Sequence, residues 1–130
     1  MKTLENMTAV VTGGSRGIGR AIALAMAQEG ANVAILYAGN REAAEQTEQE
    51  IAQIGGKVRA YQCDVSSFEQ TETITKQILE EFGQVDILVN NAGIVRDGFL
   101  LSMKEEAFDA VIDTNLKGAF HMIRHLYSHM

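Results

Sequence analysis

The sequence predicts an α/β fold, a doubly wound parallel sheet with the strand order 3-2-1-4. Two observations support this prediction. Short apolar runs alternate with longer helical patterns along the chain, which is typical of parallel strands joined by helices on both faces of a sheet. Right-handed crossovers then place the third strand beyond the second, and the fourth on the other side of the first. The order reverses between strands one and four, where ligands bind at the carboxyl ends of the strands.

The first unit is a strand, a helix and a second strand. Residues Thr8–Thr12 form a β-branched run, TAVVT, which favours a strand. Residues Gly17–Glu29 repeat apolar side chains at the spacing of one helix face, and Gly30 is expected to end that helix. The apolar run Val33–Tyr37 predicts the second strand.

The next helix and strand continue the alternation. Residues Arg41–Ile54 predict a charged helix that ends at Gly55. Its thin apolar stripe consists of Ala44, Thr47, Ile51 and Ile54. Residues Lys57–Cys63 alternate in polarity, as a strand with one buried face does, and predict the third strand.

A capping signal opens the third helix. Ser66 and Ser67 stand three residues before Glu69 and Gln70, so both pairs match a capping box. The helical pattern that follows ends at Gly83.

The last part of the chain predicts one more strand and further helix. Residues Val85–Val89 predict the fourth strand, which is expected to leave an open edge and uncovered helix faces. Ser102 with Glu105 marks the start of another helix. Residues 115–130 continue in a helical pattern.

Composition limits the class of protein. The chain is 46% hydrophobic and 22% charged, as globular proteins are, and its length suits one domain, residues 1–130. The net charge of −6 argues against binding to nucleic acid. No apolar run is long enough for a membrane span, no secretory signal is expected, and a single cysteine fits a reducing compartment. We therefore expect a soluble cytoplasmic domain.

The stretch TGGSRGIG, residues 12–19, lies between the first strand and the first helix. A helix N-terminus offers unpaired N–H groups and a partial positive charge, which attract a phosphate. Glycines at Gly13, Gly17 and Gly19 would let the backbone approach a pyrophosphate. A plain glycine loop is the alternative, but the position between a strand and a helix favours a dinucleotide site.

Arg16 indicates which dinucleotide binds. A cation at a helix N-terminus is disfavoured by the helix dipole unless an anion is close, although a solvated surface arginine is the alternative. An NAD site places an acid after the second strand to bind the ribose 2′-hydroxyl. This chain has YAGNR at Tyr37–Arg41, without an acid. The sequence therefore favours NADP(H), whose 2′-phosphate Arg16 would bind.

Four motifs, in order, give the chain a family resemblance. TGGSRGIG resembles the TGxxxGxG fingerprint of the short-chain dehydrogenases/reductases. The pair Asp64-Val65, the NNAG of Asn90–Gly93 and the TNLKG around Asn115 are similar to the family's later motifs. The resemblance covers essentially the whole chain and implies a Rossmann-type NAD(P)-binding domain.

The resemblance also implies roles for single residues. The implied cofactor-binding residues are Gly13, Ser15, Arg16, Gly17, Ile18, Gly19, Asn40, Asp64, Val65, Asn90, Asn91, Ala92 and Gly93. The loop would hold the pyrophosphate and ribose phosphate, Asp64 and Val65 the adenine, and the NNAG residues the cofactor ribose. Asn115 would hold a water in the proton relay through a local helix irregularity. Alone, Asp64 is also an ordinary strand-end acid, NNAG a turn, and Asn115 an ordinary helical residue.

The resemblance is most detailed to the family's reductases of bacterial fatty-acid synthesis. It extends over SRGIGRAIA, the GN pair after the second strand, and the segment from LVNNAG to NLKGAF. It implies NADPH-dependent reduction of a 3-oxoacyl thioester, carried on acyl carrier protein or CoA, by a homo-oligomer at full length. A reductase for another carbonyl substrate, or a non-catalytic nucleotide-binding fragment, are the alternatives.

The catalytic residues of the family are missing from the sequence. The family uses a serine, a tyrosine and a lysine four residues after that tyrosine, because a nearby cation lowers the phenol pKa. None of Tyr37, Tyr61 and Tyr127 is followed by a lysine at that spacing. We therefore expect the N-terminal half of a reductase, truncated after the fourth strand and its helices and inactive alone.

Three histidines near the end of the chain and the single cysteine are the candidates for metal or redox chemistry. His121, His125 and His129 repeat at a spacing of four, which can place metal ligands on one helix face. No second motif supplies more ligands, so a polar or interface face is expected and no metal site. Cys63 is expected to be a buried, inert thiol.

Overall fold

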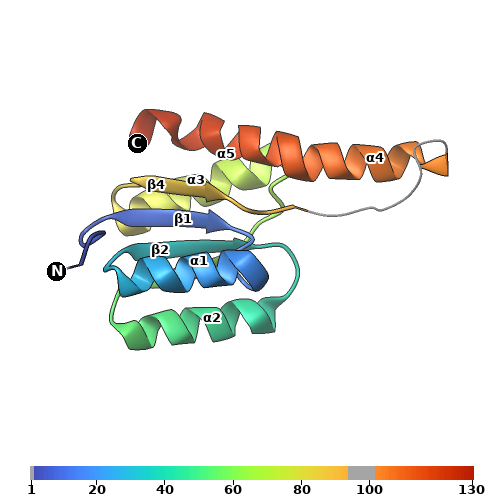
Figure 1. The fold of residues 1–130 in the computed structure, drawn as a ribbon. Helices are drawn as coiled ribbons and strands as arrows, with labels where there is room; N and C mark the ends of the chain where they lie inside the picture. The colour runs from blue at the N-terminus through green and yellow to red at the C-terminus, as the bar shows by residue number, and fades with distance from the viewer. Residues whose placement is uncertain (1, 94–101) are drawn as a thin grey trace.

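The computed structural model describes residues 2–93 and 102–130. In this part of the chain, one parallel sheet has the strand order β3-β2-β1-β4 (Figure 1). The strands are β1 (Thr8–Thr12), β2 (Asn32–Tyr37), β3 (Val58–Gln62) and β4 (Ile87–Asn90). The predicted fold class and strand order are confirmed.

The register brings the carboxyl ends of β1 and β4 together. Thr12 pairs with Leu36 of β2 on one side and with Asn90 of β4 on the other. Because all the strands are parallel, the loops after β1 and β4 start side by side. This is the point where the strand order reverses, as the sequence predicts.

Helices cover both faces of the sheet (Figure 1). One face carries α1 (Gly17–Gln28) and α2 (Arg41–Ile54), and the other carries α3 (Phe68–Phe82) and α5 (Gly118–Leu126). Because strands that are covered on both faces are apolar throughout, this arrangement explains the continuous apolar runs of β1 and β2.

The predicted final helix is divided into distinct segments. The chain from residue 105 forms α4 (Glu105–Val111), a π-helical segment (Ile112–Lys117), α5, and a 3-10 turn (Tyr127–His129). α4 extends past the carboxyl ends of the strands (Figure 1). None of the described helices is both long enough and apolar enough to cross a membrane.

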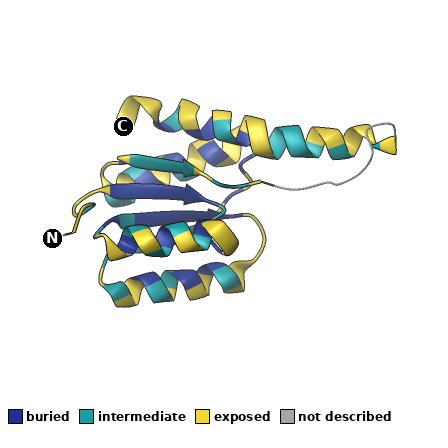
Figure 2. Cartoon of the chain, in the orientation of Figure 1, coloured by how far each residue is buried: buried dark blue, intermediate teal, exposed yellow. Residues whose placement is uncertain are grey.

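The core has two layers, because successive strand residues face opposite sides of the sheet. Side chains of β1, β2, α3 and α5 form one layer, with Val10, Ala34, Leu36, Ile78 and Met122 among its members. Side chains of β1, β2, α1 and α2 form the other, with Val11, Val33, Ile35, Ala23 and Ile51. All of these side chains are almost fully buried (Figure 2).

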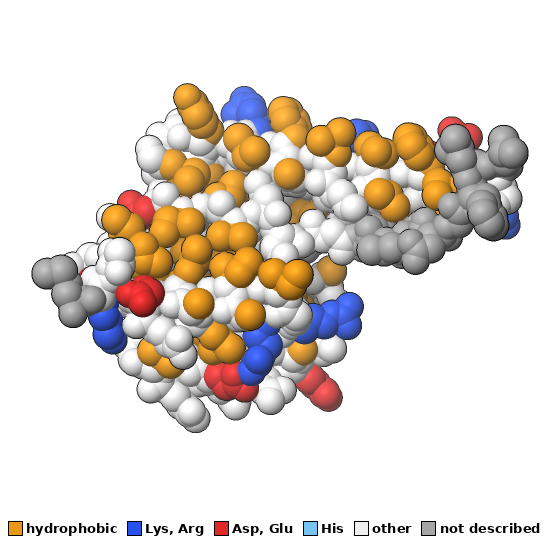
Figure 3. All heavy atoms as spheres, viewed as in Figure 1, with side chains coloured by type: hydrophobic (Ala, Val, Ile, Leu, Met, Phe, Trp, Pro, Cys, Tyr) orange, Lys and Arg blue, Asp and Glu red, His pale blue; other side chains and the backbone are white. Residues whose placement is uncertain are grey.

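In the described part of the chain, β4 lies at the edge of the sheet. Ile87, Leu88 and Val89 are half-buried, whereas β1 is buried throughout (Figure 2). Hydrophobic side chains also line the outer side of α4 and α5, where Phe120 and Ile123 are exposed (Figure 3). These surfaces are the open edge and uncovered helix faces that the sequence predicts.

The starts of α2 and α3 show how local capping sets the boundaries. α2 has the predicted bounds, Arg41–Ile54. Ser67 caps α3, because its hydroxyl accepts the Gln70 N–H at 3.2 Å. The Gln70 side chain accepts the Asp64 N–H at 2.9 Å instead of completing the capping box with Ser67. Of the two predicted capping pairs, therefore, only Ser67 with Gln70 forms, and it makes only the bond from the Gln70 N–H to the Ser67 hydroxyl.

Two elements begin two residues later than the sequence predicts. β4 starts at Ile87, two residues after the predicted start. Asp86 explains this, because its carboxylate accepts the Thr8 N–H and its own N–H donates to the Thr8 carbonyl, both at 2.9 Å. α4 starts at Glu105 after Lys104, and so begins later than a cap at Ser102 predicts.

Candidate nucleotide-binding site

A cleft of about 600 Å³ lies at the carboxyl ends of the strands. Most of the predicted cofactor-binding residues line it: Gly13, Ser15, Arg16, Gly17, Asn40, Asp64, Val65, Asn91, Ala92 and Gly93. Ile18, Gly19, Asn90 and Asn115 lie outside its wall, although Thr114, next to Asn115, lines it. The fold thus brings together segments that are far apart in sequence.

The glycine loop turns from β1 into α1 and forms one wall of this cleft. Gly13 has a φ of +67°, a left-handed conformation that side chains disfavour, and its N–H donates to the Leu36 carbonyl at 2.8 Å. α1 begins at Gly17 after Arg16. Within the described residues, no side chain caps this helix start and no acid lies in its first turn, so its N–H groups suit an anion.

Gly19 allows α1 to pack closely against the loop. A methyl group at this position would overlap the Gly13 carbonyl oxygen and come within 2.5 Å of the Asn91 Nδ2 atom. Gly19 is buried and outside the cleft wall. Its role in the structure is therefore close packing behind the loop.

Thr12 ties the loop after β1 to the loop after β4. Its hydroxyl oxygen accepts the N–H groups of Asn91 and Ala92, each at 3.0 Å. The Asn91 side chain donates to the Gly13 carbonyl at 3.2 Å, and so holds the loop. Thr12 is the first residue of the TGxxxGxG stretch, but the resemblance implies no role for it.

The predicted adenine wall is held by its own turn and by α5. One Asp64 oxygen accepts the Ser66 N–H at 3.0 Å and the Ser66 hydroxyl at 2.6 Å. Val65 is buried, and its carbonyl lies 2.8 Å from the His121 Nδ1 atom. A methyl group at Gly118 would lie 2.7 Å from the Val65 side chain, so α5 packs tightly on this wall.

The opposite wall is the N-terminus of α2. The Asn40 side chain accepts the Ala43 N–H at 3.0 Å and so caps this helix. Both Arg16 and Asn40 are exposed and line the cleft. Asp64 is the one acid among the described residues of the lining, and it lies on the far wall.

Asn115 lies beside the end of the NNAG turn. A methyl group at Gly93 would be 3.1 Å from the Asn115 Oδ1 atom. Asn115 is part of the π-helical segment, which is the kind of helix irregularity that the resemblance implies. π-helical turns are frequent at functional sites.

The histidines of α5 pack inward, whereas the sequence leads us to expect a polar or interface face. His121 is buried against Phe68, with ring centroids 5.5 Å apart. The His125 Nε2 atom lies 3.1 Å from the Thr71 Oγ1 atom of α3, and burial lowers the pKa of His125. Within residues 2–93 and 102–130, no His, Cys, Asp and Glu side chains gather into a group of three or more fit for a metal.

Cys63 borders the cleft and is almost fully buried. Burial, together with the nearby Asp64 carboxylate, raises the pKa of its thiol to about 11. The thiol is therefore protonated at neutral pH and unreactive by itself, because the thiolate is the nucleophile.

A parallel sheet in the order 3-2-1-4, with a glycine loop and a helix start that no described side chain caps at its switch point, defines a Rossmann-type α/β fold. The model of the short chain dehydrogenase family matches residues 7–130. The chain belongs to this family.

Individual relatives agree with the family. The chain is 50% identical over 119 residues to the 3-oxoacyl-[acyl-carrier-protein] reductase FabG of Staphylococcus epidermidis, a match that covers 92% of this chain and 49% of that protein. It is 46% identical over 120 residues to the 3-oxoacyl-[acyl-carrier-protein] reductase of Synechocystis, again covering 92% of this chain and 49% of the relative. The chain spans about half the length of the curated relatives it matches.

Solved structures also match in fold. A short chain dehydrogenase from Burkholderia cenocepacia, in complex with NADP, superposes with a TM-score of 0.95 at 37% identity. That match covers 98% of this chain and 52% of the other. A dehydrogenase/reductase from Sinorhizobium meliloti gives a TM-score of 0.95 at 41% identity, covering 98% of this chain and 51% of that one.

Proposed function

We propose that the chain is the nucleotide-binding part of an NADPH-dependent reductase of 3-oxoacyl thioesters. One observation carries the choice of ligand: an uncapped α1 N-terminus beside Arg16, at the switch-point cleft, in a chain with no acid at residues 37–41. The names of the relatives support the thioester substrate.

The residues of the cleft fit a dinucleotide phosphate. Gly13 adopts a left-handed turn that glycine tolerates without steric cost, and the loop after it leaves the α1 N–H groups without a side-chain partner among the described residues. When bound, the nicotinamide would supply a hydride to the substrate carbonyl. The part of this chain is to hold the adenosine and pyrophosphate through the loop, Asp64 and Val65.

The 2′-phosphate distinguishes NADPH from NADH. A carboxylate after β2 would repel this phosphate, whereas Asn40 offers a neutral amide and Arg16 a cation. Guanidinium–phosphate hydrogen bonds are among the strong charge-assisted ones. We propose that Arg16 binds the 2′-phosphate.

The described tyrosines are poor proton donors for a bound carbonyl. The Tyr61 hydroxyl donates to the Glu81 carboxylate at 2.6 Å, and burial together with that carboxylate raises the pKa of Tyr61 above its usual 10.0. Tyr37 lines the cleft but is buried, and Tyr127 lies beyond α5 and outside this lining. Because general acid catalysis contributes roughly 10²–10⁴-fold, we propose that the chain binds NADPH without turnover of its own.

The binding test compares NADPH and NADH on the native chain and on two variants that each lose one cation. Arg16→Ala removes the cation among the described residues of the cleft lining. Arg59→Ala removes a cation of β3 that pairs with Glu81 of α3 and lies outside this lining. A charge-assisted bond of about 1.5–3 kcal/mol predicts at least roughly a tenfold loss of NADPH affinity for Arg16→Ala, with NADH affinity kept. Arg59→Ala should bind as the native chain does. Equal native affinities for the two dinucleotides would refute the choice of NADPH.

The turnover test measures NADPH oxidation with a 3-oxoacyl thioester. The native chain alone is expected to show none, and addition of a polypeptide that corresponds to the second half of a full-length relative is expected to restore it. Turnover by the chain alone at the rate of a full-length relative would show that another group donates the proton.

A further inference from the structure

Thr47 occupies a position where the helix pattern calls for an apolar side chain. α2 buries one stripe, and Thr47 lies in it between Ala44 and Ile51, with no exposed surface. A buried hydroxyl is costly unless it makes a hydrogen bond. The hydrogen-bond partners of this hydroxyl therefore indicate the role of Thr47.

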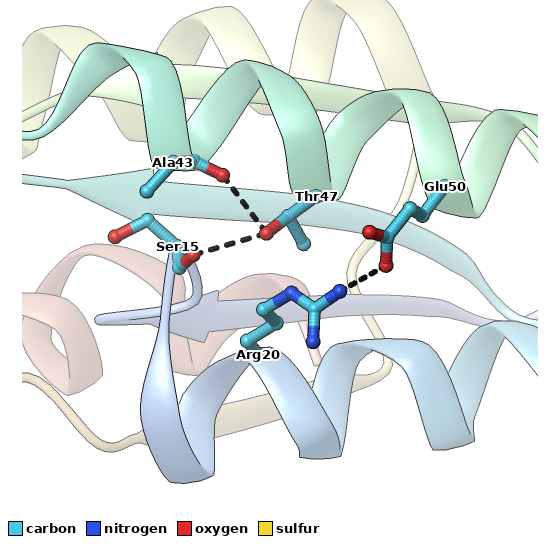
Figure 4. Close-up of polar contacts among 5 residues, drawn as sticks. All are labelled: Ser15, Arg20, Ala43, Thr47 and Glu50. Carbon is cyan, nitrogen blue, oxygen red and sulfur yellow. Dashed lines mark hydrogen bonds and ion pairs between the residues drawn. The ribbon is translucent and has the colours of Figure 1, made fainter.

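The Thr47 hydroxyl reaches out of its own helix (Figure 4). Its oxygen lies 3.0 Å from the Ala43 carbonyl, the local acceptor that any helical threonine can use. It also lies 3.0 Å from the carbonyl of Ser15, in the glycine loop, 32 residues earlier. The first backbone bond of α1 goes from the Arg20 N–H to the Arg16 carbonyl, so the Ser15 carbonyl precedes those that the helix uses.

A second contact, one turn along α2, joins this helix to α1, which follows the loop. Arg20 of α1 forms an ion pair with Glu50 (Figure 4). Both side chains are about a third exposed, and surface ion pairs are screened by salt and contribute little. Of these two polar contacts, the buried one between Thr47 and Ser15 therefore contributes more to holding the loop against α2.

This contact links the two walls of the cleft that face the proposed 2′-phosphate. Arg16 directly follows Ser15 in the loop. On the other wall, the Ala43 N–H bonds the Asn40 side chain, and the Ala43 carbonyl is the second acceptor for Thr47. One continuous chain of contacts thus runs from the loop through Thr47 to the N-cap of α2.

We infer that Thr47 is a positioning residue for cofactor choice: its hydroxyl sets the distance between Arg16 and Asn40, and so the affinity for an adenosine 2′-phosphate. This inference rests on the proposed function, since it presumes that the cleft takes a 2′-phosphorylated nucleotide.

The effect is selective for the 2′-phosphate because of where each phosphate would bind. The 5′-phosphates meet the loop and the start of α1, which Thr12, Asn91 and Gly19 hold against the loop after β4 through contacts that do not involve α2. The 2′-phosphate would lie between the loop and α2. Only the second site changes when the two elements shift relative to each other.

The experiment measures the dissociation constants of 2′,5′-ADP and of ADP for the 130-residue chain. Thr47→Val keeps the shape and loses the hydroxyl, whereas Thr47→Ser keeps the hydroxyl. The preference of the native chain for 2′,5′-ADP should fall roughly three- to tenfold in Thr47→Val, the range of one lost hydrogen bond, with ADP affinity unchanged. Thr47→Ser should keep the native preference.

Urea unfolding of each variant separates positioning from folding. Should Thr47→Val fail to fold, Thr47→Ala serves as the second hydroxyl-free variant, and failure of both to fold would show a structural role and overturn the inference. An unchanged preference in the hydroxyl-free variants, or equal weakening of both nucleotides, overturns it as well and leaves the proposed function standing. A native chain that binds neither nucleotide refutes the proposed function, and the inference with it.

Discussion

Replacement of Gly19 by alanine tests whether α1 needs a glycine for packing against the loop. Within a helix, an alanine is ordinarily more stable than a glycine by about 0.5–1 kcal/mol. Here the added methyl group would overlap the Gly13 carbonyl oxygen and approach the Asn91 side chain. The expected sign of the change is therefore reversed.

The magnitude follows from the contacts behind Gly19. Overpacking costs about 1–3 kcal/mol, and loss of the bond from Asn91 to Gly13 adds about 0.5–1.5 kcal/mol. After subtraction of the helix preference, the free energy of unfolding should fall by about 2 kcal/mol. Because the loop must move, nucleotide affinity should fall in the same variant.

Urea unfolding followed by far-UV circular dichroism measures the change. The control is Gly39→Ala, because a methyl group at Gly39 would meet nothing within 4 Å and no left-handed φ is required there. That variant should stay within about 0.5 kcal/mol of the native chain. A Gly19→Ala chain as stable as the native one would refute the packing argument.

Substitutions at Thr12 and His125 test two contacts between elements of the fold. Thr12→Val should lower the free energy of unfolding by about 2 kcal/mol, because it leaves the Ala92 N–H without its partner. Thr12→Ser keeps the hydroxyl and should lower it by about 1 kcal/mol. Equal losses of stability in urea unfolding of the two variants would contradict this. The pKa of His125 is lowered below 6.5, chiefly by burial, so the unfolded chain takes up more protons as the pH falls through that value. The native chain should therefore lose more stability than His125→Gln between about pH 7.5 and 5.5, measured by urea unfolding, and parallel profiles would argue against it.

Local signals in the sequence predict the elements that depend on local contacts. The bounds of α2 follow from Asn40, which caps its start, and from Gly55, which adopts the left-handed conformation at its end. The start of β4 is wrong by two residues, because Asp86 bonds Thr8 from 78 positions away. A pattern along the chain carries no information about such a partner.

The same limit explains which site residues the sequence identifies. The glycine loop is recognised because its spacing is a local property. Thr12 and Thr47 act through partners 80 and 32 residues distant. Thr12 belongs to the recognised TGGSRGIG stretch and Thr47 resembles an ordinary helix residue, but neither partner can be identified from the sequence. His121 and His125 look like a surface stripe until α3 packs on them and supplies Phe68.

The exposed guanidinium of Arg16 stands on an acidic molecule, and this has a consequence for kinetics. A net charge of −6 repels a polyanionic ligand at long range, whereas Arg16 and the α1 N-terminus attract it only at contact. Charges are screened beyond about 8 Å at physiological ionic strength. Added salt therefore removes the repulsion that slows encounter before it weakens the short contacts that hold the ligand, and moderate salt favours capture of the nucleotide.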